Sequence, residues 1–383
     1  MGEEFAPLIF SHVFGLSSTV AEQLIPTLPK FKLITQMTNW KIFQGNREPH
    51  DGIKRLPPPP SWRRFSADDD IRKTIADRWP TFCQGLDQKT ETMDRGKSFR
   101  IYSDRDQDKN RVVDMVNAAL YLRRPLLVTG KPGTGKTSLA YGVAYELNLG
   151  PVLSWPIKAR STLKDGLYDY DAIARLQDAQ RGEKSKDIGP YIQLGPLATA
   201  LLPFPHPRVL LIDEIDKSDI NLPNDLLNLF EEGSFEIPEL TRISKKVPLV
   251  EVRSYDGMDV PIKKGEVSCQ NFPLIILTNN GDRDFPPAFL RRCLRLTMPY
   301  EQDATALKEI VKAHLGDDLF TQDGEKIKKL IRDFIDRRSG GDLATDQLLN
   351  AIYIVTRDLK PEREDEDNLI EELLKYLTSE EDR

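Results

Sequence analysis

The sequence lacks the features of a secreted or membrane-anchored protein. No apolar run among its 383 residues is long enough to span a bilayer, and no basic segment precedes an apolar one at the start. The chain begins Met-Gly, but Ala6 stands where an acylation motif requires Ser or Thr. With 39% hydrophobic and 30% charged residues, the composition is that of a globular protein, and we expect it in the cytoplasm.

Cysteine is scarce, and basic residues are not in excess. Cys83, Cys269 and Cys293 are widely spaced and odd in number, which predicts reduced thiols and no zinc site. The formal net charge is −6, and residues 360–383 alone carry ten acidic and four basic side chains. The rest of the chain is close to neutral, so a nucleic-acid-binding face is not expected. For the acidic end, a solvated terminal helix is favoured over an interaction tail.

One glycine-rich stretch, GKPGTGKT at 130–137, lies between an apolar run and a helix-like segment. Its glycines accept positive backbone torsions and leave N–H groups open to an anion, and the following helix adds its positive dipole end. Lys136 supplies a mobile charge for the terminal phosphates, and Thr137 supplies a hydroxyl for Mg²⁺. The pattern predicts a phosphate-binding loop rather than a plain turn before a helix. The expected nucleotide-binding residues are Gly130, Lys131, Pro132, Gly133, Thr134, Gly135, Lys136, Thr137 and Ser138.

Two carboxylates follow a second buried strand. The run at 208–212 is apolar throughout, as strands of parallel sheets are, and it is followed by Asp213 and Glu214. Ligands of such sheets bind at the carboxyl ends of the strands, so Asp213 is expected to hold Mg²⁺ beside Thr137. Glu214 is expected to be the general base that orients water toward the γ-phosphate of ATP. The alternative is an acidic loop without a role, which the phosphate-binding loop upstream disfavours.

Polar residues also end the next apolar strand. Asn280 is the first candidate for an amide that contacts both the γ-phosphate and the attacking water, with Asn279 as the reserve; either could instead be a turn former before Gly281. Farther on, Arg291 and Arg292 follow PPAFL on a short helix. A guanidinium delivered to the γ-phosphate accelerates hydrolysis by roughly 10³ to 10⁵. Arg292 is the favoured group, with Arg291 beside it, and surface salt bridges are the alternative.

The segments around these motifs predict how they are carried. Strands that alternate with helices predict an α/β fold, in which a P-loop core with a parallel β-sheet flanked by helices is followed by a small all-α lid domain. The expected domains are an N-terminal Pro/Trp-containing extension of unknown fold at 1–108, the nucleotide-binding core at 109–299, and the helical lid at 300–383. A polar and aromatic excursion interrupts the core at 160–194, and a β-hairpin is expected between 234 and 266.

The extension offers two features. A helix is expected at 67–78, begun by three aspartates and stopped by Pro80. Pro57–Pro60 form a stiff polyproline spacer, followed by Trp62 and two arginines. These residues are either an anchor for a partner or for the nucleotide edge, or Trp62 packs on the main domain, which is the favoured interpretation.

Taken together, GKPGTGKT, LLIDEID, a strand that ends in TNN, PPAFLRRC and the helical lid resemble an AAA+ ATPase. Within that superfamily, DEIDKS followed by LPNDLLNLFEEGSFEIPE is similar to the MoxR family. The excursion and the hairpin before the sensor strand resemble the two insertions of that branch. The resemblance covers about residues 110–357.

The resemblance implies a homo-oligomer, a hexameric ring, in which ATP lies between subunits and the arginine finger acts on the neighbour's nucleotide. It also implies a chaperone-like or remodelling role on a protein partner with a von Willebrand factor A domain. The excursion and the hairpin would then face the central pore, where Tyr168 and Tyr170 either grip a client or pack in the interior. Similar bacterial proteins often belong to multi-gene systems, some of them proposed in phage defence.

One position departs from that family. Its lid helix carries an arginine that contacts the γ-phosphate, but the matching stretch here, GGDLATDQLLNA at 340–351, has Asp346-Gln347 at the expected position. Arg337-Arg338 stand earlier in the chain. Lid closure therefore depends on other contacts, or Arg63 or Arg64 reaches the site from the extension.

The leading interpretation is a Mg²⁺-dependent ATPase that remodels a protein partner. A nucleic-acid-directed motor, including the McrB-like GTPases of the same branch, is disfavoured because no basic stripe is present. The segment 279–282, Asn-Asn-Gly-Asp, also lacks the lysine of a guanine reader. A nucleotide-gated scaffold that assembles on ATP and turns over slowly is the third interpretation, supported by the missing lid arginine.

Overall fold

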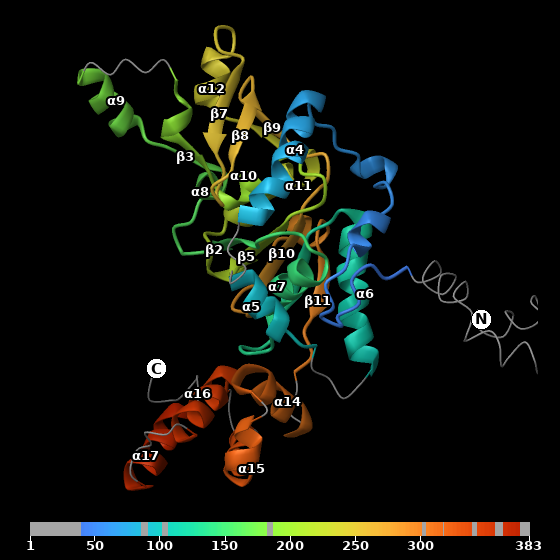
Figure 1. Cartoon of the computed structure of the whole chain (residues 1–383), viewed down its shortest axis with the longest axis vertical. Helices are drawn as coiled ribbons and strands as arrows, with labels where there is room; N and C mark the ends of the chain where they lie inside the picture. Colours follow the sequence, from blue (N-terminus) through green and yellow to red (C-terminus); the bar gives the residue numbers. More distant parts are fainter. Residues whose placement is uncertain are drawn as a thin grey trace, which may run out of the picture. The chain divides into compact units, whose positions relative to one another are not determined.

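The computed structural model describes residues 40–85, 91–101, 106–181, 187–300, 304–316, 318–338, 343–356 and 363–375 (Figure 1). The chain divides into two compact units, residues 1–42 and 43–383, and all the helices and strands named below belong to the second. The amino-terminal features discussed above, Ala6 among them, lie outside the described residues, as do positions 340–342 of the lid stretch.

A five-stranded parallel sheet forms the centre of the core. Its spatial order is β11 (Leu294–Thr297), β1 (Leu126–Thr129), β10 (Leu274–Asn279), β5 (Val209–Asp213) and β2 (Leu153–Pro156). Every pairing in it is parallel. The helices α6 (Asp106–Leu122), α7 (Lys136–Glu146) and α10 (Pro196–Ala200) contact its strands. The predicted α/β fold, a parallel sheet flanked by helices, is therefore confirmed. Strands of such a sheet are buried on both faces, which requires the continuous apolar runs found in the sequence.

The excursion and the hairpin join in a second sheet. Its order is β3 (Tyr168–Tyr170), β4 (Ile192–Leu194), β7 (Leu249–Arg253), β8 (Asp259–Lys263), β9 (Glu266–Ser268) and β6 (Ser234–Glu236). The predicted hairpin is confirmed as the antiparallel pair β7–β8, whose turn contains Gly257 at φ +95°. The sequence did not predict that β4 of the excursion pairs with β7 of the hairpin. Short helices accompany this sheet: α8 (Leu163–Leu167), α9 (Ala172–Gln180), η4 (Gly189–Tyr191) and α12 (Pro238–Ile243).

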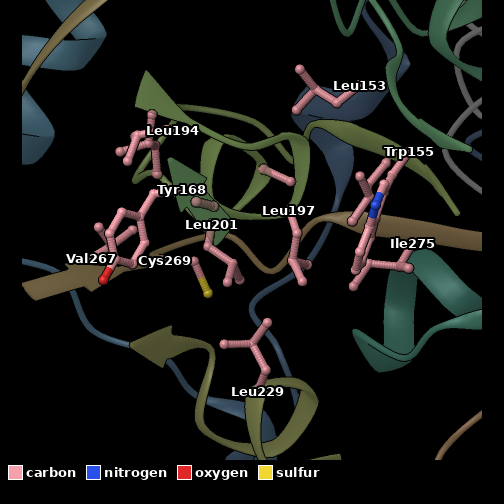
Figure 2. Packing of buried hydrophobic residues seen from close by; sticks show 14 of the residues in the cluster. Leu153, Trp155, Tyr168, Leu194, Leu197, Leu201, Leu229, Val267, Cys269 and Ile275 are labelled. Carbon is pink, nitrogen blue, oxygen red and sulfur yellow. The ribbon is translucent and has the colours of Figure 1, made fainter. Parts of the chain in front are cut away.

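One hydrophobic cluster runs through both sheets. Figure 2 shows members of it from the first sheet, Trp155 of β2 and Ile275 of β10, and from the second, Tyr168 of β3 and Val267 of β9. The helix α11 (Leu222–Glu232) adds Leu229 to the same cluster. The second sheet is therefore packed onto the nucleotide-binding core through continuous apolar contact rather than attached as a separate domain.

The helix predicted at 67–78 is longer than expected. α4 spans Asp69–Gly85 and contains Pro80 in its interior, so the predicted stop at Pro80 is wrong. An interior proline costs a helix about 3 kcal/mol. The aromatic residues near Pro80 pack together: the centre of the Trp79 ring lies 4.9 Å from that of Phe204 and 5.7 Å from that of Phe82. That burial offsets the lost hydrogen bond.

The extension contributes three more elements, η2 (Gly52–Arg55), η3 (Ser61–Arg63) and α5 (Glu91–Ser98), of which α5 packs on α7. In η3, Trp62 is 73% exposed, so the favoured interpretation that it packs on the main domain is wrong. Its neighbour Arg63 takes the buried place instead, with its guanidinium on backbone carbonyls of the core. Arg63 is thus committed to structure and is not available to a nucleotide.

The carboxyl-terminal region is helical, as predicted. It consists of α14 (Ala304–Leu315), α15 (Asp318–Arg338), α16 (Thr345–Val355) and α17 (Arg363–Leu373). These helices share a hydrophobic cluster of their own, which includes Val311, Phe334 and Ile352. The lid is therefore a small body with its own core, joined to β11 by the segment that contains Tyr300.

Candidate functional site

The glycine-rich loop connects β1 to α7 and has the backbone that the sequence predicted. Gly133 and Gly135 have φ of +75° and +81°, values that favour glycine, and Gly135 is the N-cap of α7. A Cβ on Gly133 would lie 2.6 Å from the backbone nitrogen of Thr345 in the lid. Gly133 is therefore required both by its torsion and by close approach of the lid.

The Lys136 side chain folds back over this loop. Its Nζ donates to the carbonyl oxygens of Gly130 at 2.7 Å and Lys131 at 2.9 Å. Burial lowers the pKa of Lys136, and nearby carboxylates, Asp216 first among them, act in the opposite direction. The ammonium is thus a half-desolvated charge whose two partners are neutral carbonyls, so phosphate oxygens would bind it more strongly.

Thr137 and Asp213 meet as predicted at the carboxyl edge of the sheet. The Thr137 hydroxyl donates to Asp213 Oδ1 at 2.9 Å, and the same oxygen accepts the Thr278 hydroxyl at 2.6 Å. Thr278 Oγ1 in turn accepts the backbone N–H of Glu214 at 2.8 Å. Thr278 was not predicted as a site residue, although it stands at the end of β10 next to Asn279.

The Glu214 backbone is in the left-handed region, at φ 59° and ψ 51°. Strain of this kind in a residue with a side chain persists where the surroundings enforce it, often at functional sites. The carboxylate receives Lys217 Nζ at 2.7 Å on Oε2, while Asn280 Nδ2 lies 3.4 Å from Oε1. The two predicted residues, Glu214 and Asn280, therefore face each other beside Asp213.

Asp216 ties the turn after β10 to the segment after β5. Its buried carboxylate accepts the backbone N–H of Asn280 at 2.9 Å and that of Asp282 at 3.4 Å. Arg283 adds a second tie, since its guanidinium donates to the Ser218 carbonyl and hydroxyl, both at 2.7 Å. Neither residue was predicted; the signal in the sequence is the third acidic residue of LLIDEID.

Comparison with known proteins agrees with this geometry. Residues 125–293 match the family model of the AAA domain, dynein-related subfamily. Residues 125–293 are therefore similar to an AAA domain. Among solved structures, that of C. elegans PCH-2 is similar with 15% identity and a TM-score of 0.32, over 82% of this chain and 70% of that chain. No curated protein sequence matches the chain.

Arg291 and Arg292 lie at the amino ends of the strands of the five-stranded sheet, whereas Asp213 lies at the carboxyl end of β5. Arg291 and Arg292 precede β11, and the backbone N–H of Leu294 donates to the carbonyl of Pro125, which precedes β1. Strands of four to six residues, with a rise of about 3.3 Å per residue, separate this edge from Asp213 by roughly 15 Å. The structure therefore does not bring the arginines to the nucleotide residues of the same chain.

The two arginines differ in their surroundings. Arg291 is exposed, and its backbone carbonyl accepts Arg124 Nη1 at 3.0 Å. Arg292 Nε lies 2.7 Å from Glu231 Oε1, and Arg63 Nη1 lies 3.6 Å from the other oxygen of that carboxylate. Arg291 is thus the more available guanidinium, whereas Arg292 is part of an ion-pair network.

A cavity of about 220 Å³ lies between the AAA+ loop and the lid. Its wall includes Gly133, Ser138, Tyr300, Arg338 and Thr345. The Arg338 guanidinium lies over the Tyr300 ring at 4.2 Å, and Lys131 Nζ lies 4.7 Å from the ring centre. An arginine of the lid, Arg338 at the end of α15, therefore lines this cavity, although the stretch 340–351 has none.

The remaining predicted loop residues surround the same cavity or support it. Thr134 lines the cavity, and its hydroxyl donates to the Lys131 carbonyl at 2.9 Å. Pro132 is exposed at the loop tip. Gly133, Thr134, Gly135 and Ser138 of the loop thus form one wall of this cavity.

Of the two interpretations of Tyr168, interior packing is the one that the structure supports. Tyr168 is 8% exposed, and its hydroxyl donates to Glu239 at 2.8 Å. Burial raises the pKa of this hydroxyl. The Tyr170 hydroxyl accepts Arg175 Nη1 at 3.0 Å. Exposed apolar side chains of the excursion are instead Ile173 and Leu176 on α9.

Among the residues that the structure describes, no group of three or more His, Cys, Asp or Glu could hold a metal ion by itself. Thr137 and Asp213 nevertheless fit Mg²⁺, which is commonly held by one or two protein oxygens together with substrate phosphates and waters. None of the helices in the described part of the chain has the length and apolar character that crossing a bilayer requires.

Proposed function

We propose that the chain is a Mg²⁺-dependent ATPase of the MoxR-like branch. The observation that carries the proposal is the chain of hydrogen bonds from Thr137 through Asp213 to Thr278, at the mouth of the glycine-rich loop. Glu214 and Asn280 lie beside it. These groups are what hydrolysis needs at the γ-phosphate: a metal-binding pair, a carboxylate and an amide.

Each side chain has a distinct task in this proposal. Lys136 exchanges its loop carbonyls for phosphate oxygens, and Thr137 with Asp213 holds Mg²⁺, which when bound neutralises phosphate charge. Glu214 accepts a proton from the attacking water, while Asn280 fixes the position of that water. Lys217, at 2.7 Å from Glu214, holds the carboxylate in its orientation. Arg338 approaches the phosphates from the lid.

We infer that the active unit is a head-to-tail assembly of copies. The supporting observation is that Arg291 and Arg292 lie at the amino ends of the strands, opposite Asp213, so neither reaches the nucleotide residues of its own chain. Interfaces between unlike patches close into rings when the rotation permits. In keeping with the MoxR resemblance, we propose a hexamer that remodels a protein partner with a von Willebrand factor A domain, within a bacterial defence-type system.

The test is the replacement of Glu214 by Gln. Glu214→Gln removes the proton acceptor and keeps the shape, so we expect ATP affinity within threefold of wild type and turnover reduced by roughly 10² to 10⁴. Glu251→Gln, in an ion pair with Arg78 on the second sheet, is the matched control and should leave both unchanged. Binding is measured with a fluorescent ATP analogue and turnover by phosphate release, with and without Mg²⁺. Undiminished turnover in Glu214→Gln, or no ATP binding by wild type, would contradict the proposal.

A further inference from the structure

Trp62 is a large apolar side chain on the surface of a firmly anchored segment. At 73% exposed, it is the most exposed of the four tryptophans of the chain. An aromatic side chain left in water forgoes the favourable burial that a protein core or interface would give. Burial of Trp62 in an interface would therefore be favourable.

The next residue, Arg63, anchors this segment. Arg63 donates to the Phe230 carbonyl at 2.8 Å and, through Nη2, to the Arg123 carbonyl at 2.6 Å. Arg123 Nη2 donates in turn to the carbonyl of Pro57 at 2.8 Å. The polyproline run and η3 are thus tied at both ends, so Trp62 is presented on a rigid base.

Hydrogen bonds connect the segment that carries Trp62 to a group of arginines. Arg63 bonds to the carbonyl of Arg123, whose neighbour Arg124 bonds to the carbonyl of Arg291. We define the arginine patch as Arg64, Arg124, Arg291 and Arg292. Glu231 is the acidic residue that pairs with this group, contacting both Arg63 and Arg292. Arg124 precedes β1, and Arg291 and Arg292 precede β11, so these three residues lie at the amino ends of the strands of the five-stranded sheet.

The opposite edge of the sheet has the complementary character. We define the acidic mouth as Asp213, Glu214, Asp219 and Asp282, which lie at or after the carboxyl ends of β5 and β10; Lys217 offsets part of this charge through its ion pair with Glu214. Ile220, next to Asp219, is 70% exposed and offers an apolar surface there. Bound nucleotide adds further negative charge to this edge. One copy of the chain thus carries both halves of a charge-complementary contact, each with an exposed apolar side chain.

We propose that Trp62 is an interface anchor that docks, together with the arginine patch, on the acidic mouth of a second copy of this chain. Opposite charges on the two edges make the contact heterologous, and large aromatics beside arginines dominate the energetics of such interfaces. This inference rests on the proposed function and adds to it a residue of the extension. The segment 57–64 is then the part of the extension that joins copies.

The experiment measures self-association of the full chain by sedimentation velocity, over a range of protein concentrations with Mg²⁺ and a non-hydrolysable ATP analogue. Trp62→Ala should weaken association by tenfold or more. Arg64→Glu should also weaken association, with a larger effect at low salt than at high salt. Tyr255→Ala removes a 44% exposed aromatic from the hairpin turn and is the matched control, which should associate as wild type does. Equal association of Trp62→Ala and wild type would overturn the inference.

A second readout follows Trp62 directly. In a Cys83→Ser background, Trp62→Cys is labelled with an environment-sensitive fluorophore, whose emission should shift to shorter wavelength at concentrations where sedimentation shows that the labelled chain associates. An unchanged spectrum at those concentrations overturns the inference. Nucleotide binding is measured in the same samples, which distinguishes failure of this inference from failure of the proposed function. If Trp62→Ala associates as wild type does and wild type binds nucleotide, only the inference is wrong. If wild type binds no nucleotide, the proposed function itself is contradicted.

Discussion

The Asp216 carboxylate accepts the backbone N–H of Asn280 at 2.9 Å, and this bond connects the segment after β5 to the turn after β10. Because Asp216 also accepts the N–H of Asp282, one buried carboxylate fixes the turn that presents the Asn280 amide to Glu214. Asp216 touches no reacting atom and is therefore a positioning residue.

Replacing Asp216 by Ala should lower turnover by roughly ten- to a hundredfold, because Asn280 loses its fixed position. Nucleotide affinity should change by less than threefold, since the glycine-rich loop is untouched. Asp216→Asn keeps a carbonyl oxygen that can accept these bonds and should restore most of the activity. Steady-state kinetics with thermal melting of each variant checks this. Equal losses of affinity and turnover would assign Asp216 to general stability instead.

Gly133→Ala should separate the lid from the loop. The new methyl group would lie 2.6 Å from the Thr345 nitrogen, in addition to the strain of φ +75°. We expect nucleotide affinity to fall at least tenfold. Gly257→Ala, at φ +95° in the hairpin turn and without a contact closer than 3.6 Å, carries the strain alone. Titration with a fluorescent ATP analogue compares the two; similar affinities would show that the lid contact has no role in binding.

Arg338 should act as the cation of the lid. It lines the cavity and stacks on Tyr300, so Arg338→Ala should lower nucleotide affinity by roughly ten- to a hundredfold, the range of a lost charge-assisted bond of about 1.5–3 kcal/mol. Arg337→Ala, one position earlier on α15 and outside the cavity wall, is the control. Isothermal titration with ATP should find only the first variant impaired, and the reverse order would move the lid cation to Arg337.

The two buried thiols predict an alkaline loss of stability. Burial raises the pKa of Cys269 and of Cys293 from 9.0 to about 12. The folded chain keeps these protons where the unfolded chain releases them, so the free energy of unfolding should fall as pH rises from about 9 to about 12. Below pH 9 the two thiols should have no effect. Urea unfolding of wild type and of Cys269→Ala/Cys293→Ala across pH 7 to 10.5 measures the difference, and parallel curves would contradict it.

What the sequence predicted correctly depends on short stretches of chain. The loop at 130–137 and the pairing of Thr137 with Asp213 follow from local motifs and from the rule that parallel strands end at one edge. Asp216 and Arg283 escaped prediction because they act on backbone groups of another segment, for which no residue pattern exists. The predicted helix stop at Pro80 was wrong because aromatic packing between distant parts of the chain stabilises the helix beyond this proline. Arg338 reaches the cavity through the fold of the lid, which motif spacing does not encode.

The central claim, that ATP is hydrolysed at a site shared between copies, is tested most directly by mixing two inactive variants. Glu214→Gln lacks the proton acceptor but keeps its arginines, while a chain with Arg291→Ala and Arg292→Ala keeps Glu214. Copies of the second can receive arginines from copies of the first, so an equal mixture should regain about a quarter of wild-type phosphate release at random assembly. If the mixture stays as inactive as its components while both still bind ATP, each site works within one chain and the shared-site account is wrong.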